Sequence, residues 1–159
     1  MGLYRETRNV EASILDFIEE KLSEYDWDVR IVKTFNQAYK EKMPVICIRC
    51  SDNVPTSCEI GSHELMNYYS VLIDIFAFDD GLKLDLSDWL INTVKNGFPY
   101  YEYTISKNVQ GHYEVANKVQ NGKLELLRFT SDRNLEFGEN ADAYDKHRRL
   151  ISFIVYIQN

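Results

Sequence analysis

The sequence predicts a single α+β domain in which a mostly antiparallel, twisted sheet packs against two helices. The chain has 159 residues, the size of one ordinary domain, with no internal repeat and no linker rich in Gly, Pro or Ser. Eleven Tyr and eight Phe against three Pro favour strands. Two segments with helical apolar spacing lie among segments whose apolar residues alternate. We therefore treat residues 1–159 as one domain.

The first predicted helix follows Asn9, a suitable N-cap, and ends near Leu22. Its apolar residues recur on one face, while acidic residues and Lys21 cover the solvent side. The apolar face consists of Val10, Ile14, Phe17, Ile18 and Leu22. We expect this face to pack against the sheet.

The second predicted helix begins at Asp79-Asp80-Gly81, which ends the preceding strand and supplies an N-cap. Gly97 followed by Pro99 is a typical stop signal. Between them, one continuous apolar face contains Leu82, Leu86, Trp89, Leu90 and Thr93. This helix also has to bury one side.

Five segments have the alternation or the β-branched and aromatic content of strands. They are Trp27–Phe35, Val45–Ile48, Tyr68–Phe78, Tyr100–Ser106 and Arg149–Ile157. The third and the fifth present apolar residues on both faces, which predicts strands that are covered on both sides. The third is the strongest candidate for a central strand.

Asn121-Gly122 predicts a β-hairpin, because both residues tolerate the positive φ of a type I′ turn. The implied register pairs Val119 with Leu124 and Lys118 with Glu125. After this hairpin, Thr130 to Tyr144 is polar and acidic without a clean period. We interpret this segment as a long exposed loop.

The net charge of −7 comes from 18 basic and 25 acidic residues. An acidic surface repels phosphate groups, so we expect no non-specific binding to nucleic acid or to anionic membranes over the whole surface. A local basic patch stays open, and the longest basic cluster is Lys146-His147-Arg148-Arg149. No segment approaches the roughly 20 apolar residues of a membrane helix. The N-terminus lacks the apolar core of a signal peptide. These features predict an intracellular protein whose three cysteines are reduced.

Cys47 and Cys50, with Cys58 and His63 downstream, are residue types that bind zinc. Their spacing argues against a metal site, because an odd separation along a strand points the first two thiols to opposite faces. Ile-Arg between them is also poor turn material. We interpret them as buried or half-buried free thiols.

Other catalytic patterns are missing from the sequence, including a phosphate-binding glycine loop, a nucleophile elbow and a paired-histidine zinc helix. The acidic pairs Asp79-Asp80 and Glu19-Glu20 fit a turn and a solvated helix face. We therefore expect a binding protein with no catalytic residue, no cofactor and no metal. Two alternatives stay open: a thiol-dependent hydrolase that uses Cys58 or Cys50 with His63, and a monomeric regulatory domain for a small ligand.

The order of elements is one helix, two or three strands, a second helix and further strands. The last strand is entered through the charged segment Asp145-Lys146-His147-Arg148-Arg149 and continues as Leu150-Ile151-Ser152-Phe153-Ile154-Val155. Together with the first helix and the strand Tyr68–Phe78, this pattern resembles the tail terminator and tail-completion proteins of long-tailed bacteriophages. The resemblance covers most of the chain and rests on element order rather than on an invariant motif.

The resemblance implies a structural virion protein of the phage neck, assembled in the host cytoplasm. Such a protein forms a ring, typically a hexamer, that ends the tail tube and joins it to the head connector. DNA would pass through the lumen without specific binding. Another head–tail connector or adaptor is the alternative within the same class. The Gly111–Thr130 hairpin would be an insertion relative to the family.

A ring needs matching patches on each subunit, and desolvated aromatic and arginine side chains are the usual anchors of such contacts. The loop Ser131–Tyr144 would contact neighbouring subunits or face the lumen. The assembly residues that we predict in and around it are Arg128, Arg133, Phe137, Tyr144 and Arg148.

Overall fold

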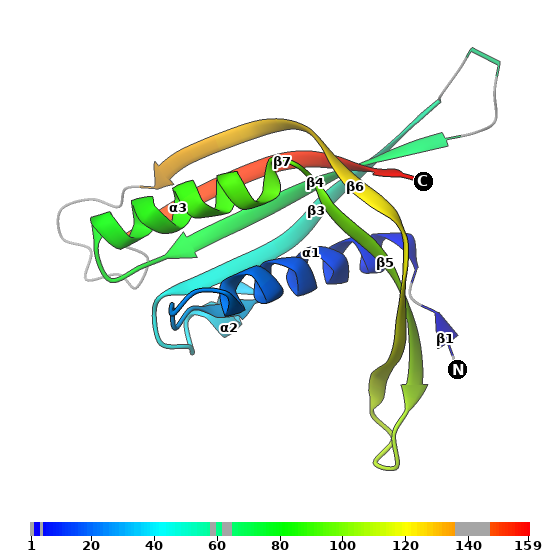
Figure 1. Ribbon diagram of the computed structural model, residues 1–159, viewed down its shortest axis with the longest axis horizontal. Helices are drawn as coiled ribbons and strands as arrows, with labels where there is room; N and C mark the ends of the chain where they lie inside the picture. The colour runs from blue at the N-terminus through cyan, green and yellow to red at the C-terminus, as the bar shows by residue number, and fades with distance from the viewer. Residues whose placement is uncertain (1, 4, 58–59, 62–64, 136–146) are drawn as a thin grey trace.

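The computed structural model describes residues 2–3, 5–57, 60–61, 65–135 and 147–159. These residues form one seven-stranded sheet and three helices (Figure 1). The elements are β1 (Gly2–Leu3), α1 (Glu6–Ser23), β2 (Arg30–Val32), α2 (Phe35–Ala38), β3 (Val45–Ser57), β4 (Leu65–Phe76), α3 (Asp80–Val94), β5 (Phe98–Lys107), β6 (Tyr113–Leu135) and β7 (Arg148–Gln158). The α+β class predicted from the sequence is confirmed.

The strands lie in the order β1-β5-β6-β7-β4-β3-β2. Neighbouring strands are antiparallel, except that β2 runs parallel to β3. The sheet is therefore mixed but mostly antiparallel. β4 lies between β7 and β3, which confirms its predicted central position.

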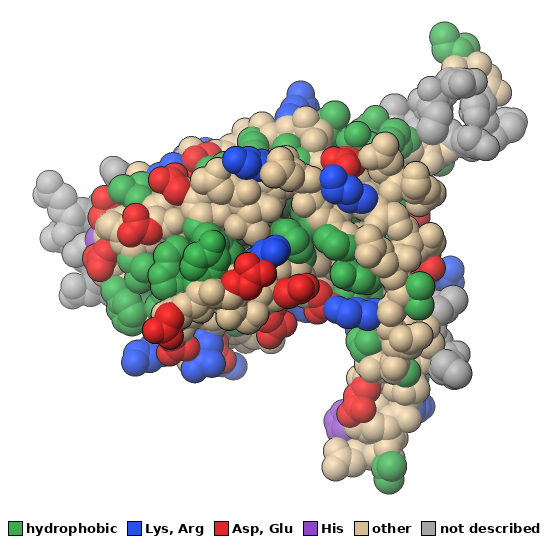
Figure 2. Space-filling view, in the orientation of Figure 1, with side chains coloured by type: hydrophobic (Ala, Val, Ile, Leu, Met, Phe, Trp, Pro, Cys, Tyr) green, Lys and Arg blue, Asp and Glu red, His purple; other side chains and the backbone are tan. Residues whose placement is uncertain are grey.

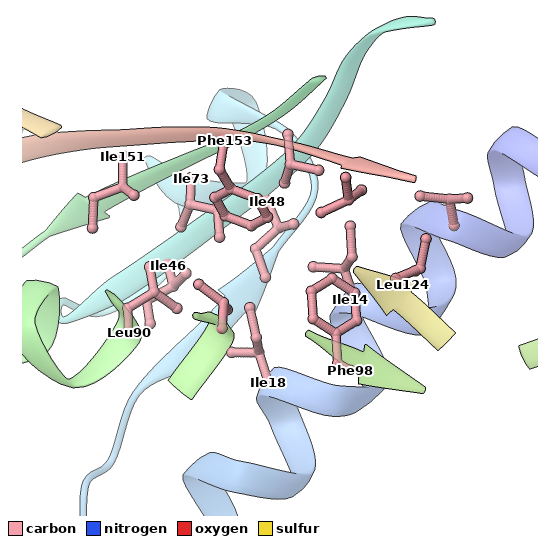
Figure 3. Close-up of a cluster of buried hydrophobic side chains, with 14 of the residues drawn as sticks. Ile14, Ile18, Ile46, Ile48, Ile73, Leu90, Phe98, Leu124, Ile151 and Phe153 are labelled. Carbon is pink, nitrogen blue, oxygen red and sulfur yellow. The ribbon is translucent and has the colours of Figure 1, made fainter. Parts of the chain in front are cut away.

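Helices α1 and α3 cover the same face of the sheet, and the sheet curls around them (Figure 1). Apolar residues of both helices and of five strands form one buried cluster, shown in part in Figure 3. The labelled members include Ile14, Ile18, Ile48, Ile73, Leu90, Phe98 and Phe153, each at most 1% exposed. Burying a side chain of this size contributes about 1.5–3 kcal/mol. The short helix α2 covers part of the opposite face, where Ala38, Val45, Cys47 and Phe76 form a second, smaller cluster.

The prediction that Asn9 caps the first helix is wrong, because α1 begins at Glu6 and Asn9 lies inside it. Asn9 is buried, and its side-chain oxygen accepts a hydrogen bond of 3.2 Å from the backbone N–H of Tyr103 in β5. One turn later, Ser13 Oγ accepts the N–H of Tyr101 at 2.9 Å. An unpaired buried N–H is costly. These two buried polar side chains therefore supply partners for β5 backbone groups that face α1.

The predicted signals at both ends of the second helix are confirmed. Asp79 is the N-cap of α3, and its side chain accepts a 2.8 Å hydrogen bond from the N–H of Leu82. The helix ends at Val94, whose carbonyl oxygen accepts the N–H of Gly97 at 3.0 Å. Gly97 has φ +75°, a conformation that favours glycine.

The predicted strand Trp27–Phe35 is too long. Only Arg30–Val32 is a strand, and Thr34 then caps the short helix α2 through a 3.2 Å hydrogen bond from the N–H of Gln37. Trp27 instead packs its ring against Trp89 of α3, with 5.9 Å between the ring centroids. The alternation of apolar and polar residues before Arg30 therefore reflects an irregular segment that packs on the helices, not a strand.

The predicted hairpin at Asn121-Gly122 is wrong, because both residues lie inside β6. Gln120 pairs with Tyr101 and Lys123 pairs with Pro99, so two residues of β6 lie opposite one residue of β5. This is a β-bulge. Lys123 and Leu124 then pair with β5 on one side and β7 on the other, and after them β6 pairs with β7 alone. Asn-Gly provides positive φ for a bulge as well as for a turn, and here Gly122 has φ +110°.

The turn between β5 and β6 lies instead at residues 108–112. The Asn108 side-chain oxygen accepts hydrogen bonds from the N–H groups of Gln110 and His112, and Gly111 has φ +83°. The predicted loop from Thr130 is also wrong in its first part, because residues 130–135 continue β6. Its remainder, up to Tyr144, lies outside the described residues.

Candidate assembly surfaces

The face of the sheet opposite α1 and α3, called here the outer face, is organised around a buried carboxylate. Asp74 of β4 is fully buried, and both of its oxygens are ion-paired. Arg49 Nη2 of β3 lies 2.8 Å from Oδ2, and Arg148 Nη2 of β7 lies 2.7 Å from Oδ1. A carboxylate is stable in such a place only when it is paired. The three residues therefore join three neighbouring strands.

Helix α2 places an aromatic ring beside both guanidinium groups. The centroid of the Phe35 ring lies 4.3 Å from Arg49 Cζ and 4.7 Å from Arg148 Cζ. Two arginines share one carboxylate, so this cluster keeps a surplus positive charge. Asp74 and Phe35 were not identified from the sequence. The available signal was an Asp in the middle of an otherwise apolar strand.

Three of the five predicted assembly residues lie on the outer face. Arg128 is paired with Ile154 and Arg133 with Leu150, and both partners belong to the outer side of β7 together with Arg148. Arg128 and Arg133 are exposed, and neither forms an ion pair within the described residues. Arg148 is only 14% exposed and binds Asp74, so its guanidinium is committed inside the subunit. Phe137 and Tyr144 lie outside the described residues.

A groove of about 940 Å³ runs on the opposite side of the molecule, between α1, residues 25–33 and the β5–β6 hairpin. Apolar side chains such as Leu15, Val29 and Val115 line it. Three acidic residues, Asp16, Glu19 and Glu41, and three basic residues, Arg30, Lys33 and Lys118, also line it. Figure 2 shows acidic side chains, with some basic side chains among them, beside an apolar area on this side, where α1 and α3 lie. We call this side the helical face.

The wall of the groove is held by one hydrogen-bonded pair. The Tyr103 hydroxyl donates to Asp16 Oδ2 at 2.6 Å, and Lys118 Nζ lies 3.4 Å from the same oxygen. Burial and the hydrogen bond to Asp16 raise the pKa of Tyr103. The hydroxyl therefore stays protonated at neutral pH and links α1 to β5.

The β5–β6 hairpin projects from the body of the molecule, and a second ribbon formed by β3 and β4 projects at another point (Figure 1). Every residue from 111 to 120 is exposed. Several are large and apolar: Tyr113 is 66% exposed, Val115 49% and Val119 57%. An isolated two-stranded ribbon in water is marginally stable. Exposed apolar side chains on such a ribbon are typical of a contact surface.

The described cysteines fit the expectation of unreactive thiols. Cys47 lies on the outer side of β3 and Cys50 packs against the core beneath α1. Burial raises the pKa of Cys47 to about 11 and that of Cys50 to about 12. Both thiols are therefore protonated at neutral pH. Cys58 and His63 lie outside the described residues.

Among the residues that the structure describes, no three His, Cys, Asp or Glu side chains are placed to share a metal ion. Within the same residues, no helix has the length and apolar content needed to span a membrane. Comparison of the sequence with models of known protein families and with curated proteins gave no significant match.

Proposed function

We propose that this protein is a structural subunit of a bacteriophage neck, which assembles into a ring, typically a hexamer, at the end of the tail tube. The observation that carries the proposal is the projecting β5–β6 ribbon with its exposed Tyr113, Val115 and Val119. A subunit that works alone has no use for such a ribbon, whereas an assembly subunit buries it against a neighbour.

The resemblance in element order to tail terminator and tail-completion proteins gives the proposal its biological setting. In that setting the ring joins the tube to the head connector and becomes part of the virion. DNA passes through the lumen without specific binding, and the protein contacts no membrane and needs no cofactor. A connector or adaptor elsewhere in the neck is the alternative, and it uses the same surfaces.

The enzyme alternative has less support. A nucleophilic cysteine needs a lowered pKa, and burial raises the pKa of Cys50, one of the two candidate nucleophiles. The other candidate, Cys58, and its proposed partner His63 lie outside the described residues. We therefore assign no catalytic residue and propose that the protein is not an enzyme.

Two measurements on the purified full-length protein test this function. Electron micrographs and light scattering should show annular particles, alone or on tail tubes. Addition of the protein to a polymerising tail tube protein should arrest tube growth. A monomer at all concentrations that leaves the length distribution of the tubes unchanged would overturn the proposal.

A further inference from the structure

The two broad sides of the molecule carry opposite surplus charge. On the outer face, the register groups four arginines with the buried carboxylate of Asp74, and it also places there Lys123 and Glu125, which are ion-paired with each other. These arginines are Arg49, Arg128, Arg133 and Arg148. On the helical face, residues 11–28 contain seven acidic residues and one basic residue, Lys21. The acidic residues are Glu11, Asp16, Glu19, Glu20, Glu24, Asp26 and Asp28.

Three cations near the groove offset three of these acids, and Lys21 pairs with Glu24, so the negative surplus rests on Glu19, Glu20 and Asp26, which form no ion pair within the described residues. The three pairs near the groove are Lys33–Glu11, Arg30–Asp28 and Lys118–Asp16, at 3.5, 3.9 and 3.4 Å. Glu19 lines the groove, is exposed and forms no ion pair within the described part of the chain. Its carboxylate is available to an incoming cation.

Both faces also present apolar side chains beside their charges. Leu72, Ile154 and Tyr156 are half-buried on the outer face, where α2 covers only the end near Phe76. The groove of the helical face offers Leu15 and other apolar side chains. An apolar centre with a charged rim is the usual anatomy of a protein–protein interface.

Charge decides which partner fits these faces. Two copies related by a two-fold axis through either face would place like charges against each other, which is unfavourable. A polyanion could bind the outer face but would leave the acids of the helical face without a role. A second copy in head-to-tail orientation places the arginine face of one subunit against the acidic face of the next. Repetition of that contact closes into a ring when the rotation from one subunit to the next divides the circle.

We propose that the outer face of one copy docks onto the helical face of the next copy, with Arg128 and Arg133 directed at the side of the groove that contains Glu19. This inference rests on the proposed ring function and names its interface. It also accounts for the different roles of the arginines. Arg49 and Arg148 hold Asp74 inside the subunit, while Arg128 and Arg133 contact the neighbour.

Charge exchange tests the interface. Arg133→Glu and Glu19→Arg should each raise the dissociation constant for self-association at least about tenfold, because each places like charges together. The double variant Arg133→Glu/Glu19→Arg should return it to within about threefold of wild type, since opposite charges face each other again. Light scattering over a concentration series, alone or on tail tubes, measures these values. Arg128→Glu replaces Arg133→Glu if the latter does not fold.

Two variants with the same change in charge serve as controls. Glu20→Arg alters an exposed acid of the helical face that does not line the groove, so it should weaken association less than Glu19→Arg does. Lys95→Glu alters an exposed cation after α3, on the helical face but away from the groove, and it should not weaken association. Circular dichroism of every variant separates loss of association from loss of folding.

The outcomes distinguish the interface from the function. A wild-type protein that neither self-associates nor arrests tail tubes overturns the ring function. Association that is insensitive to Arg133→Glu and Glu19→Arg overturns the interface alone. If Arg133→Glu abolishes DNA binding while self-association is intact, the outer face is a polyanion surface and the proposed docking is wrong.

Discussion

Asp74 is a single residue on which three strands depend. Its carboxylate is fully buried between Arg49 and Arg148, so removal of its charge leaves two guanidinium groups crowded against the Phe35 ring. Buried pairs add little net stability when complete, but a broken pair leaves an uncompensated charge. The cluster therefore holds β3, β4 and β7 in register more than it adds net stability.

Asp74→Asn should lower the free energy of unfolding by about 3 kcal/mol, because two arginines lose their counter-charge in a buried site. Arg49→Gln should lower the free energy of unfolding by less than this, because Arg148 still pairs with the carboxylate. Asp85→Asn, at an exposed position in α3, is the matched control and should be near neutral. Chemical denaturation measures all three. Equal stability of Asp74→Asn and wild type would show that the cluster is dispensable.

The raised thiol pKa values make stability depend on alkaline pH. An unfolded chain releases a cysteine proton near pH 9, whereas Cys47 in the folded chain holds its proton to about pH 11. The unfolded state therefore binds fewer protons in this window, and stability falls as the pH rises. By pH 10 the loss from Cys47 should be about 1 kcal/mol.

Comparison of wild type with Cys47→Ala isolates this effect. Both proteins should lose stability above pH 9, because burial also raises the pKa of Cys50, Tyr69 and Tyr103. The variant should lose less than wild type between pH 8 and pH 10. Identical losses in urea titrations at the two pH values would contradict the assignment of the shift to Cys47.

At the scale of elements, the β6 bulge decides how the two halves of the sheet connect. Gly122 has φ +110°, and a Cβ on this residue would lie 2.6 Å from the backbone oxygen of Gln158 in β7. Gly122→Ala should therefore destabilise the fold by about 1–3 kcal/mol through strain and steric conflict. Gly111→Ala is the control, because Gly111 has φ +83° but no atom near the added Cβ. Thermal unfolding should show a clearly smaller loss for Gly111→Ala.

The same bulge shows where prediction from sequence ends. The periodic segments that form α1, α3, β4 and β7 were recognised because each buries one face or both faces. Asn121-Gly122 was assigned to a turn because local chemistry cannot distinguish a turn from a bulge. A bulge forms here because β6 pairs with β5 and β7 over more residues than it could pair with itself in a hairpin. The start of β2 at Arg30 could not be predicted for the same reason, because the segment before it is placed by packing against the helices.

The candidate surfaces were predictable only in part. Arg133 was predicted to lie in the long loop and Arg128 in the hairpin before it. Their common face follows from the pairing of β6 with β7, which the predicted hairpin at Asn121-Gly122 did not include. Arg148 was chosen for its charge, but its neighbours Asp74 and Phe35 come from distant segments. Residue type was therefore informative, whereas pairing across the sheet required the fold.

At the scale of the whole molecule, the ribbon and the charged faces address different parts of assembly. The outer face and the helical face determine which surface of the neighbouring subunit each subunit contacts, because their charges are opposite. The ribbon reaches beyond the body, and its apolar residues add area that is buried only in a complex. Loss of the ribbon contacts should thus weaken assembly without harm to the subunit.

Tyr113→Ser combined with Val119→Ser tests this separation. Both side chains are more than half exposed, so the free energy of unfolding of the monomer should change by less than about 0.5 kcal/mol per site. Self-association and arrest of tail tube growth should both be lost or strongly reduced, because the ribbon no longer offers an apolar contact. Substitution of Thr104, a half-buried residue at the base of the ribbon, by Ser controls for a general effect of changes in β5. Unchanged assembly of the double variant would show that the ribbon takes no part in the ring, and the proposed function would lose the observation that carries it.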